Sequence, residues 1–192
     1  ADNNTAVGSE ALTANTTGTR NSAVGKDALK TNTEGADNTA VGFGSALTQT
    51  TATKNTALGT YSAYRVTTGA ENTFIGYNSA SQNTTGQQNT AIGSESFISS
   101  TTGSYNTALG ACTFNATNTG DNNVAIGRKS MFDNTSGNNN VAVGNDALGN
   151  NTEGVYNIGV GVNAGLLQTT GGNNVFVGDS AGRQSTTGCK NT

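Results

Sequence analysis

The stretch Asn123-Val124-Ala125-Ile126-Gly127 decides the fold, because its pattern recurs every 17 residues along the whole chain. The Asn and the Gly return at that spacing without exception, and eleven units fill residues 4–190 with no insertion or deletion. So strict a short period is typical of a solenoid, in which each unit forms one coil. The sequence therefore predicts one solenoid domain over residues 1–192, with coils that begin at Asn4, Asn21, Asn38, Asn55, Asn72, Asn89, Asn106, Asn123, Asn140, Asn157 and Asn174.

The composition alone would favour disorder, since only 32% of the residues are hydrophobic and 11% are charged. The unbroken period argues against disorder, because a disordered chain has no reason to keep its phase. The net charge is −3 and the basic residues form no cluster, which argues against nucleic acid as a partner. No apolar run approaches the ~20 residues of a membrane helix, so we expect no membrane insertion in this segment.

The positions of one coil, numbered 1 to 17 from its Asn, predict two short strands per coil, near positions 1–5 and 8–14. Position 4 is always Val, Leu or Ile, so we expect it to face the interior together with position 2. Position 8 is always Ala, Ser or Thr, which indicates a narrow inward column. The predicted fold is all-β, a parallel β-solenoid (β-roll) of eleven coils, with a length of about 50 Å at ~4.8 Å per coil.

By alternation, position 3 is then predicted to face outward, where a column of mostly Ala would form a flat ribbon. Exposed apolar stripes tend to mark contact sites, so we interpret this ribbon as an interface with other chains. The alternative is that Ala only relieves crowding beside the Gly of position 5. The predicted interface comprises Ala6, Ala23, Ala40, Ala57, Phe74, Ala91, Ala108, Ala125, Ala142 and Phe176.

The Asn column at position 1 admits no substitute, so we predict a structural ladder. Stacked Asn side chains can bond amide to amide, and Asn also tolerates left-handed turns. A ligand-binding role is the weaker interpretation. The ladder comprises Asn4, Asn21, Asn38, Asn55, Asn72, Asn89, Asn106, Asn123, Asn140, Asn157 and Asn174.

Two local features stand outside the repeat. Coil 3 has Ala52 in place of the position-15 Gly and Gln49 at position 12, so it is the least regular coil, and Ala52 is expected to be strained if that turn is left-handed. Cys112 and Cys189 lie about 4.5 coils, or roughly 20 Å, apart, which is too far for a disulfide within one chain. They are expected to be free thiols, with pairing between chains through Cys189 as the alternative.

The residue types argue against an enzyme and against a resident cofactor. The chain has no His, which removes Ser-His and Cys-His pairs and His-based metal sites. The acids of position 7 are adjacent only in the first two coils, at Glu10 and Asp27, and such a pair is more typical of a solvated surface than of a calcium site. We expect no catalytic, cofactor or metal residues.

The run Asn122-Asn123-Val124-Ala125-Ile126-Gly127-Arg128-Lys129-Ser130 resembles the N-S-V-A-I-G-x-x-S head repeat of trimeric autotransporter adhesins. The full repeat, N-T-A-V-G-x-x-A-L-x-x-N-T-T-G, is also similar to repeats of bacterial and phage tail-fibre-like proteins. The resemblance implies a left-handed parallel β-roll that forms trimers, binds a host matrix, and turns its central small residue toward neighbouring chains. This chain differs in its longer period and in Thr or Ser at position 2 of the first seven coils.

Two functions follow from these features. The first is a non-enzymatic structural or adhesive segment of an extracellular fibre, on a cell or virion surface, that associates with itself as a trimer or filament and binds a host surface or matrix ligand. Neither end carries a polar cap, so we expect a piece of a longer rod or end-to-end stacking. The second is an ice- or hydrate-binding solenoid that uses its Thr and Ala ranks. The outward Thr rank at position 14 is broken by Glu34 and Glu153, which favours the fibre.

Overall fold

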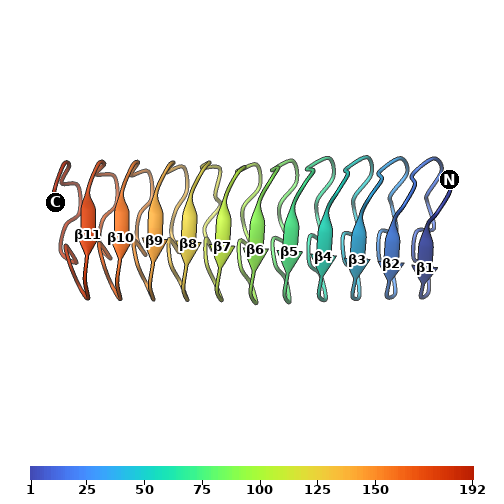
Figure 1. The fold of residues 1–192 in the computed structure, drawn as a ribbon, viewed down its shortest axis with the longest axis horizontal. Coiled ribbons are helices and arrows are strands. Elements are labelled where there is room, and N and C mark those ends of the chain that lie inside the picture. Colours follow the sequence, from blue (N-terminus) through green and yellow to red (C-terminus); the bar gives the residue numbers. More distant parts are fainter.

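The computed structural model describes all 192 residues, and they form one rod of stacked coils (Figure 1). Eleven parallel strands, one from each coil, make a single sheet in chain order, which confirms the predicted parallel β-solenoid. The strands are β1 (Thr5–Val7), β2 (Ser22–Val24), β3 (Thr39–Val41), β4 (Thr56–Leu58), β5 (Thr73–Ile75), β6 (Thr90–Ile92), β7 (Thr107–Leu109), β8 (Val124–Ile126), β9 (Val141–Val143), β10 (Ile158–Val160) and β11 (Val175–Val177).

Every strand pairs with the next in the same register, so each position of the repeat stacks on its own copy. In the middle of the rod, for example, Ala108 lies opposite Ala125, and Ala125 lies opposite Ala142. This register follows from the constant period, because any insertion would shift all later columns by the same amount. The repeat positions are therefore continuous columns of side chains that run along the rod.

Each coil has one strand, so the second strand predicted near positions 8–14 is wrong. That segment consists of turns, and its N–H groups donate within the coil, as from Asn32 to Leu29, or to the next coil, as from Leu29 to Ser45. Of 126 backbone hydrogen bonds, only 20 lie between strand residues. The other 106 hold the turns and stack them, so most of the axial bonding lies outside the sheet.

The turns depend on left-handed backbone at residues that are not Gly. Positions 7, 9 and 17 have positive φ in every coil, for example 60° at Asp27, 47° at Leu148 and 61° at Tyr105. Left-handed geometry costs a non-Gly residue about 1–2 kcal/mol. The strain recurs at these three positions along the rod, except where Gly44, Gly165 and Gly182 occupy them, and the hydrogen bonds between adjacent coils offset it.

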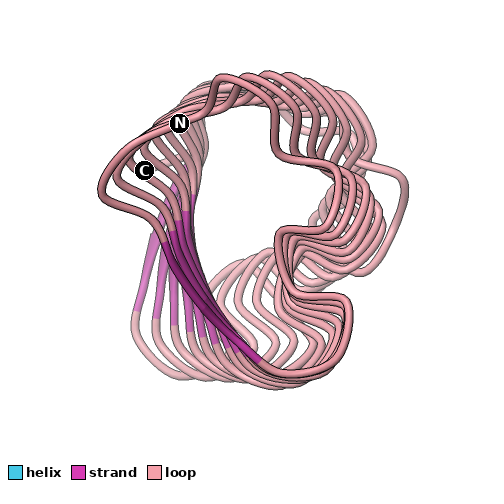
Figure 2. Ribbon diagram, turned by 90° about the vertical axis from the view of Figure 1, so that its right-hand side faces the viewer, coloured by secondary structure: helices cyan, strands magenta, loops and turns pink.

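The prediction that position 3 faces outward is wrong. Its side chains point into the rod, and all but Ala6 in the first coil are buried. The residues that the ribbon was predicted to expose, and that the structure buries, are Ala23, Ala40, Ala57, Phe74, Ala91, Ala108, Ala125, Ala142 and Phe176. Positions 2 and 4 therefore face outward, from the flat side of the cross-section that carries the strands (Figure 2).

The interior is narrow, and columns 3 and 9 fill the same space across it. A Cβ added to Gly182, at position 9, would lie 2.1 Å from the ring of Phe176, at position 3 of the same coil. Where position 3 is Gly159, a Cβ there would lie 2.9 Å from Leu148 of the preceding coil's position 9. A coil therefore holds at most one large side chain from these two columns, which is why position 3 is usually Ala.

Column 8 completes the core as predicted. Its small side chains are buried from Ala28 to Ala164, and several of the Ser residues among them bond to the sheet, although the hydroxyl of Ser130 has no partner. The hydroxyls of Ser45, Ser62 and Ser79 donate to the backbone carbonyl of position 3 in the next coil, at 2.8–3.0 Å. A larger residue at position 8 would separate the turn wall from the strands.

Candidate functional site

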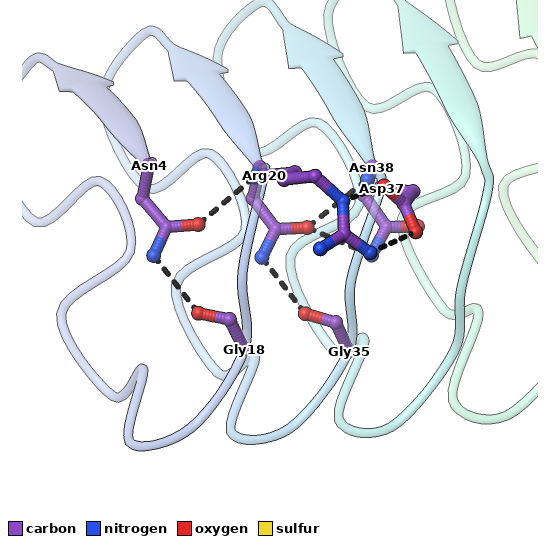
Figure 3. A network of polar contacts seen from close by, with 7 residues as sticks. Asn4, Gly18, Arg20, Gly35, Asp37 and Asn38 are labelled. Carbon is purple, nitrogen blue, oxygen red and sulfur yellow. Dashed lines mark hydrogen bonds and ion pairs between the residues drawn. The ribbon is translucent and has the colours of Figure 1, made fainter. Parts of the chain in front are cut away.

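The Asn column forms the predicted structural ladder, although its main bonds differ from those expected (Figure 3). At every junction, the backbone N–H of one Asn donates to the side-chain Oδ1 of the Asn one coil earlier, at 2.8–3.1 Å. The side-chain Nδ2 donates across its own coil to the carbonyl of position 15, at 2.7–2.9 Å. The predicted amide-to-amide bond occurs at some junctions, as from Asn123 to Asn106.

Only Asn provides both bonds at this depth. Ala would leave a buried N–H and a buried carbonyl without partners, and each such group costs about 1–3 kcal/mol. Asp would place a carboxylate against the carbonyl of position 15, and Gln would need a deeper space. The column from Asn21 to Asn174 is buried, so its invariance has a structural cause.

The Gly column at position 15 is required by close approach and not by a left-handed turn. These Gly residues do not have positive φ, but a Cβ on Gly86 would lie 2.3 Å from the carbonyl oxygen of Gly103 in the next coil. Ala52 also has no positive φ, so the strain expected from a left-handed turn is absent there. The N–H group of Ala52 has no backbone partner, and neither do those of Gly86 and Gly103, so coil 3 is not exceptional in this bond.

The outward side chains of positions 2 and 4 form the candidate interaction surface, which we call the sheet face. Its position-4 column is aliphatic in every coil, and its position-2 column is Thr or Ser in coils 1–7 and Val or Ile in coils 8–11. The position-4 residues are Val7, Val24, Val41, Leu58, Ile75, Ile92, Leu109, Ile126, Val143, Val160 and Val177. None of the 22 residues of the sheet face is charged.

The aliphatic column keeps contact with solvent although neighbouring strands cover its flanks. Val24, Val41 and Leu109 are 38%, 40% and 41% exposed, and Ile158 of the position-2 column is 38% exposed. Isolated exposed apolar residues are ordinary on protein surfaces, but a contiguous stripe along a whole molecule is not. The column that the sequence predicted to be core is therefore an apolar stripe on the surface of the rod.

A second outward column, at position 17, carries alternating charges in the first four coils. Arg20 donates two hydrogen bonds to Asp37, at 2.6 and 2.9 Å, and Lys54 donates to Glu71 at 3.1 Å. The hydrogen bond from Arg20 holds the pKa of the Asp37 carboxyl below its ordinary value, and hydrogen bonds from Gln88 and Lys54 do the same for Glu71. These exposed pairs join adjacent coils but contact no interior group.

The remaining candidates from the sequence are surface features. Glu10 and Asp27 both contact the ammonium group of Lys30, which explains their adjacency. Cys112 is half-buried and Cys189 exposed, and both are free thiols. No group of three or more His, Cys, Asp or Glu side chains is placed to hold a metal ion. The structure also has no helix of the length and apolarity needed to cross a membrane.

Sequence reasoning missed an aromatic cluster at one corner of the rod. Phe43, Tyr61 and Tyr64 pack edge to face on coils 3 and 4, beside the unpaired cation of Arg65. The signal was present, because these rings occupy positions 6, 7 and 10, which vary freely between coils. The repeat itself gives no sign of the cluster, because the cluster forms at positions where the coils differ.

Comparisons of this chain with protein-family models, with curated proteins and with solved structures found no match.

Proposed function

We propose that this chain is a non-enzymatic, self-associating segment of an extracellular fibre or surface adhesin, and that its copies associate through the sheet face. The observation that carries the proposal is the uncharged outward surface of positions 2 and 4, with its aliphatic column in all eleven coils. The resemblance to adhesin head repeats and tail-fibre repeats supports the same role and a place outside the cell or on a virion.

The size of the sheet face supports a contact between copies of the chain. Eleven strands at about 4.8 Å give a length of about 50 Å, and two side chains across give a width of about 10 Å. Each copy thus offers about 500 Å², and two copies would bury about 1,000 Å², which is the lower limit for a specific protein interface. Flanking residues would add to this area.

The constant register gives the same contact at every level of the rod. Each coil presents one aliphatic residue at position 4, so two rods aligned along their axes would repeat one small contact eleven times. Such association would stabilise the rod, because each small coil buries little apolar surface by itself. The interface that we propose lies one residue away from the Ala ribbon that the sequence predicted.

The mass of the chain in solution tests this function. We expect sedimentation equilibrium to give an oligomer, and we expect the double variant Ile92→Lys/Ile126→Lys to sediment as a monomer with an unchanged far-UV circular dichroism spectrum. The matched control is Thr102→Lys/Thr119→Lys, which adds the same charges at exposed position-14 sites where Glu34 and Glu153 already occur. A monomeric wild-type chain, or an oligomer that survives the Ile substitutions, would contradict the proposal.

An ice- or hydrate-binding role is the second candidate, and one observation favours it. The position-2 column of coils 1–7, which is Thr except for Ser22, faces outward beside the aliphatic column, at the regular strand spacing and without charge. Thermal hysteresis separates the two functions, because an ice-binding protein would be monomeric and would lower the freezing point below the melting point. Clear hysteresis from a monomer, lost on Thr73→Lys, would replace the fibre by this role.

A further inference from the structure

The outer corner of coils 3 and 4 carries a cluster of aromatic and polar side chains. In coil 4, Tyr64 and Arg65 lie between the fully buried Ala63 and Val66. Because the residues on both sides point inward, the Tyr64 and Arg65 side chains leave the coil together at its outer surface. The two residues therefore present an aromatic ring and a guanidinium group next to each other.

Two further rings extend this surface. The ring centroids of Phe43 and Tyr61 are 5.2 Å apart and those of Tyr61 and Tyr64 are 5.3 Å apart, with interplanar angles of 77° and 87°. Gly44 makes the arrangement possible, since a Cβ there would lie 3.1 Å from the Tyr61 ring. Phe43 is 39% exposed, and neither Tyr hydroxyl has a partner within the chain, so the cluster offers ring surface and free hydroxyls to solvent.

A groove of about 260 Å³ is lined by Arg65, the residue that follows Tyr64 in the chain, and by three Thr residues. The hydroxyl of Thr48 donates to the Tyr64 carbonyl at 3.0 Å, and that of Thr67 donates to the Thr84 carbonyl at 3.1 Å. Their protons are thereby engaged, while the lone pairs of both oxygens remain free to accept. The guanidinium of Arg65 makes no ion pair, so it remains free to donate to an anion.

We propose that this corner binds a saccharide that carries a carboxylate group. The C–H face of a sugar ring packs against an aromatic ring, sugar hydroxyls donate to the Thr oxygens, and a carboxylate accepts a bidentate bond from Arg65. Charge complementarity favours an acidic sugar, since Lys26 lies over the Phe43 ring at 5.9 Å and provides a second cation beside the cluster. Asp27, which follows Lys26 in the chain, is paired with Lys30.

The corner shares no residue with the sheet face, so its ligand binding can be tested apart from assembly. We expect isothermal titration calorimetry of the full chain to detect binding of trigalacturonate or of 3′-sialyllactose, and to detect weaker binding of the matching trigalacturonate methyl ester or lactose. Arg65→Gln should weaken binding of the acid about tenfold, toward that of the neutral sugar. Tyr61→Ala should weaken both acidic and neutral sugars roughly two- to tenfold.

Matched controls come from elsewhere on the same chain. Arg128→Gln removes an exposed Arg at position 6 of coil 8, and Tyr156→Ala removes a Tyr that is 58% exposed, and neither should change the affinity. Arg65 is exposed, so its substitution tests the site even if Tyr61→Ala disturbs the fold. The proposal is overturned if neither acid binds, if Arg65→Gln binds the acid as well as wild type, or if a Glu-rich peptide binds as tightly as the acidic sugars.

Discussion

Exchanging the large and small side chains of one coil tests the shared interior space of columns 3 and 9. In coil 5 the large residue is Phe74 at position 3 and the small one is Ala80 at position 9. Coil 6 has the reverse arrangement, with Ala91 and Phe97, and both pairs are fully buried. The double variant Phe74→Ala/Ala80→Phe would thus give coil 5 the arrangement that its neighbour already has.

The structure gives the expected change in the free energy of unfolding for each single variant and for the double variant. Phe74→Ala alone should lower the free energy of unfolding by about 3–5 kcal/mol, because it empties space between coils. Ala80→Phe alone should cost about 1–3 kcal/mol or more by overpacking against the Phe74 ring. The double variant should lie within about 1 kcal/mol of wild type, since each ring position is already occupied in another coil, which implies a favourable coupling of at least about 3 kcal/mol.

Guanidinium denaturation followed by circular dichroism would measure the four free energies, and amide exchange would localise the effect to coils 4–6. Phe74→Ala combined with the exposed Thr102→Ala is the matched control, and those two changes should add. If the Phe74→Ala/Ala80→Phe variant were destabilised by the sum of its single changes, the two columns would not share one space and our account of the core would be refuted.

Further predictions concern the turns, the ladder and the charged column. Gly86→Ala should lower the free energy of unfolding by about 1–3 kcal/mol, because its Cβ would meet the Gly103 carbonyl; an unchanged melting temperature would contradict the close approach. Tyr105→Gly should raise the free energy of unfolding by about 1 kcal/mol by relieving left-handed strain, as a denaturant titration can show. Asn106→Ala should lower it by about 3 kcal/mol and accelerate amide exchange in coils 6–8, since it removes the partners of buried backbone groups. The folded pKa of Asp37 is lowered, so its bond to Arg20 stabilises the first coils above the ordinary carboxyl pKa and this stabilisation disappears as the pH falls through the lowered value; exchange in coils 1–3 should accelerate in acid, and Arg20→Gln should weaken that dependence.

The repeat and its obligatory residues could be predicted from the sequence because their causes are local and recur in every coil. A constant 17-residue period admits only stacked coils in register, and the Asn column has one buried geometry that satisfies its backbone. The left-handed turns could not be predicted, because most of these positions carry residues such as Leu148 or Tyr105 that give no sign of positive φ. Stacking of hydrogen bonds between coils overrides the residue preference there.

The orientation of the strand was mispredicted because both of its faces are apolar. Alternation separates position 3 from positions 2 and 4 but does not say which side is inside when one offers Ala and the other Val. The sizes of the side chains at positions 3 and 9 would have given the correct orientation. A large residue at one position occurs with a small one at the other position of the same coil, as in Phe176 with Gly182 and Phe74 with Ala80. Two columns whose side-chain sizes compensate each other must pack in the same interior, so position 3 faces the core. The aliphatic column at position 4 then faces outward and is available for a partner.

The axial direction of the Asn ladder has a mechanical consequence. Its backbone-to-amide bonds, like the other bonds between coils, run along the rod, so tension applied at the two ends of a chain pulls the end coil away from its neighbour. Such a load breaks one junction at a time and leaves the rest intact. Each released coil of 17 residues would lengthen the chain by about 50 Å, from about 4.8 Å when stacked to about 56–61 Å when extended. A rod of this kind would lengthen in equal steps under force, one coil at a time, and its coils would restack when the force is removed. As part of a fibre it would act as an extensible stalk whose maximum length is set by its number of coils.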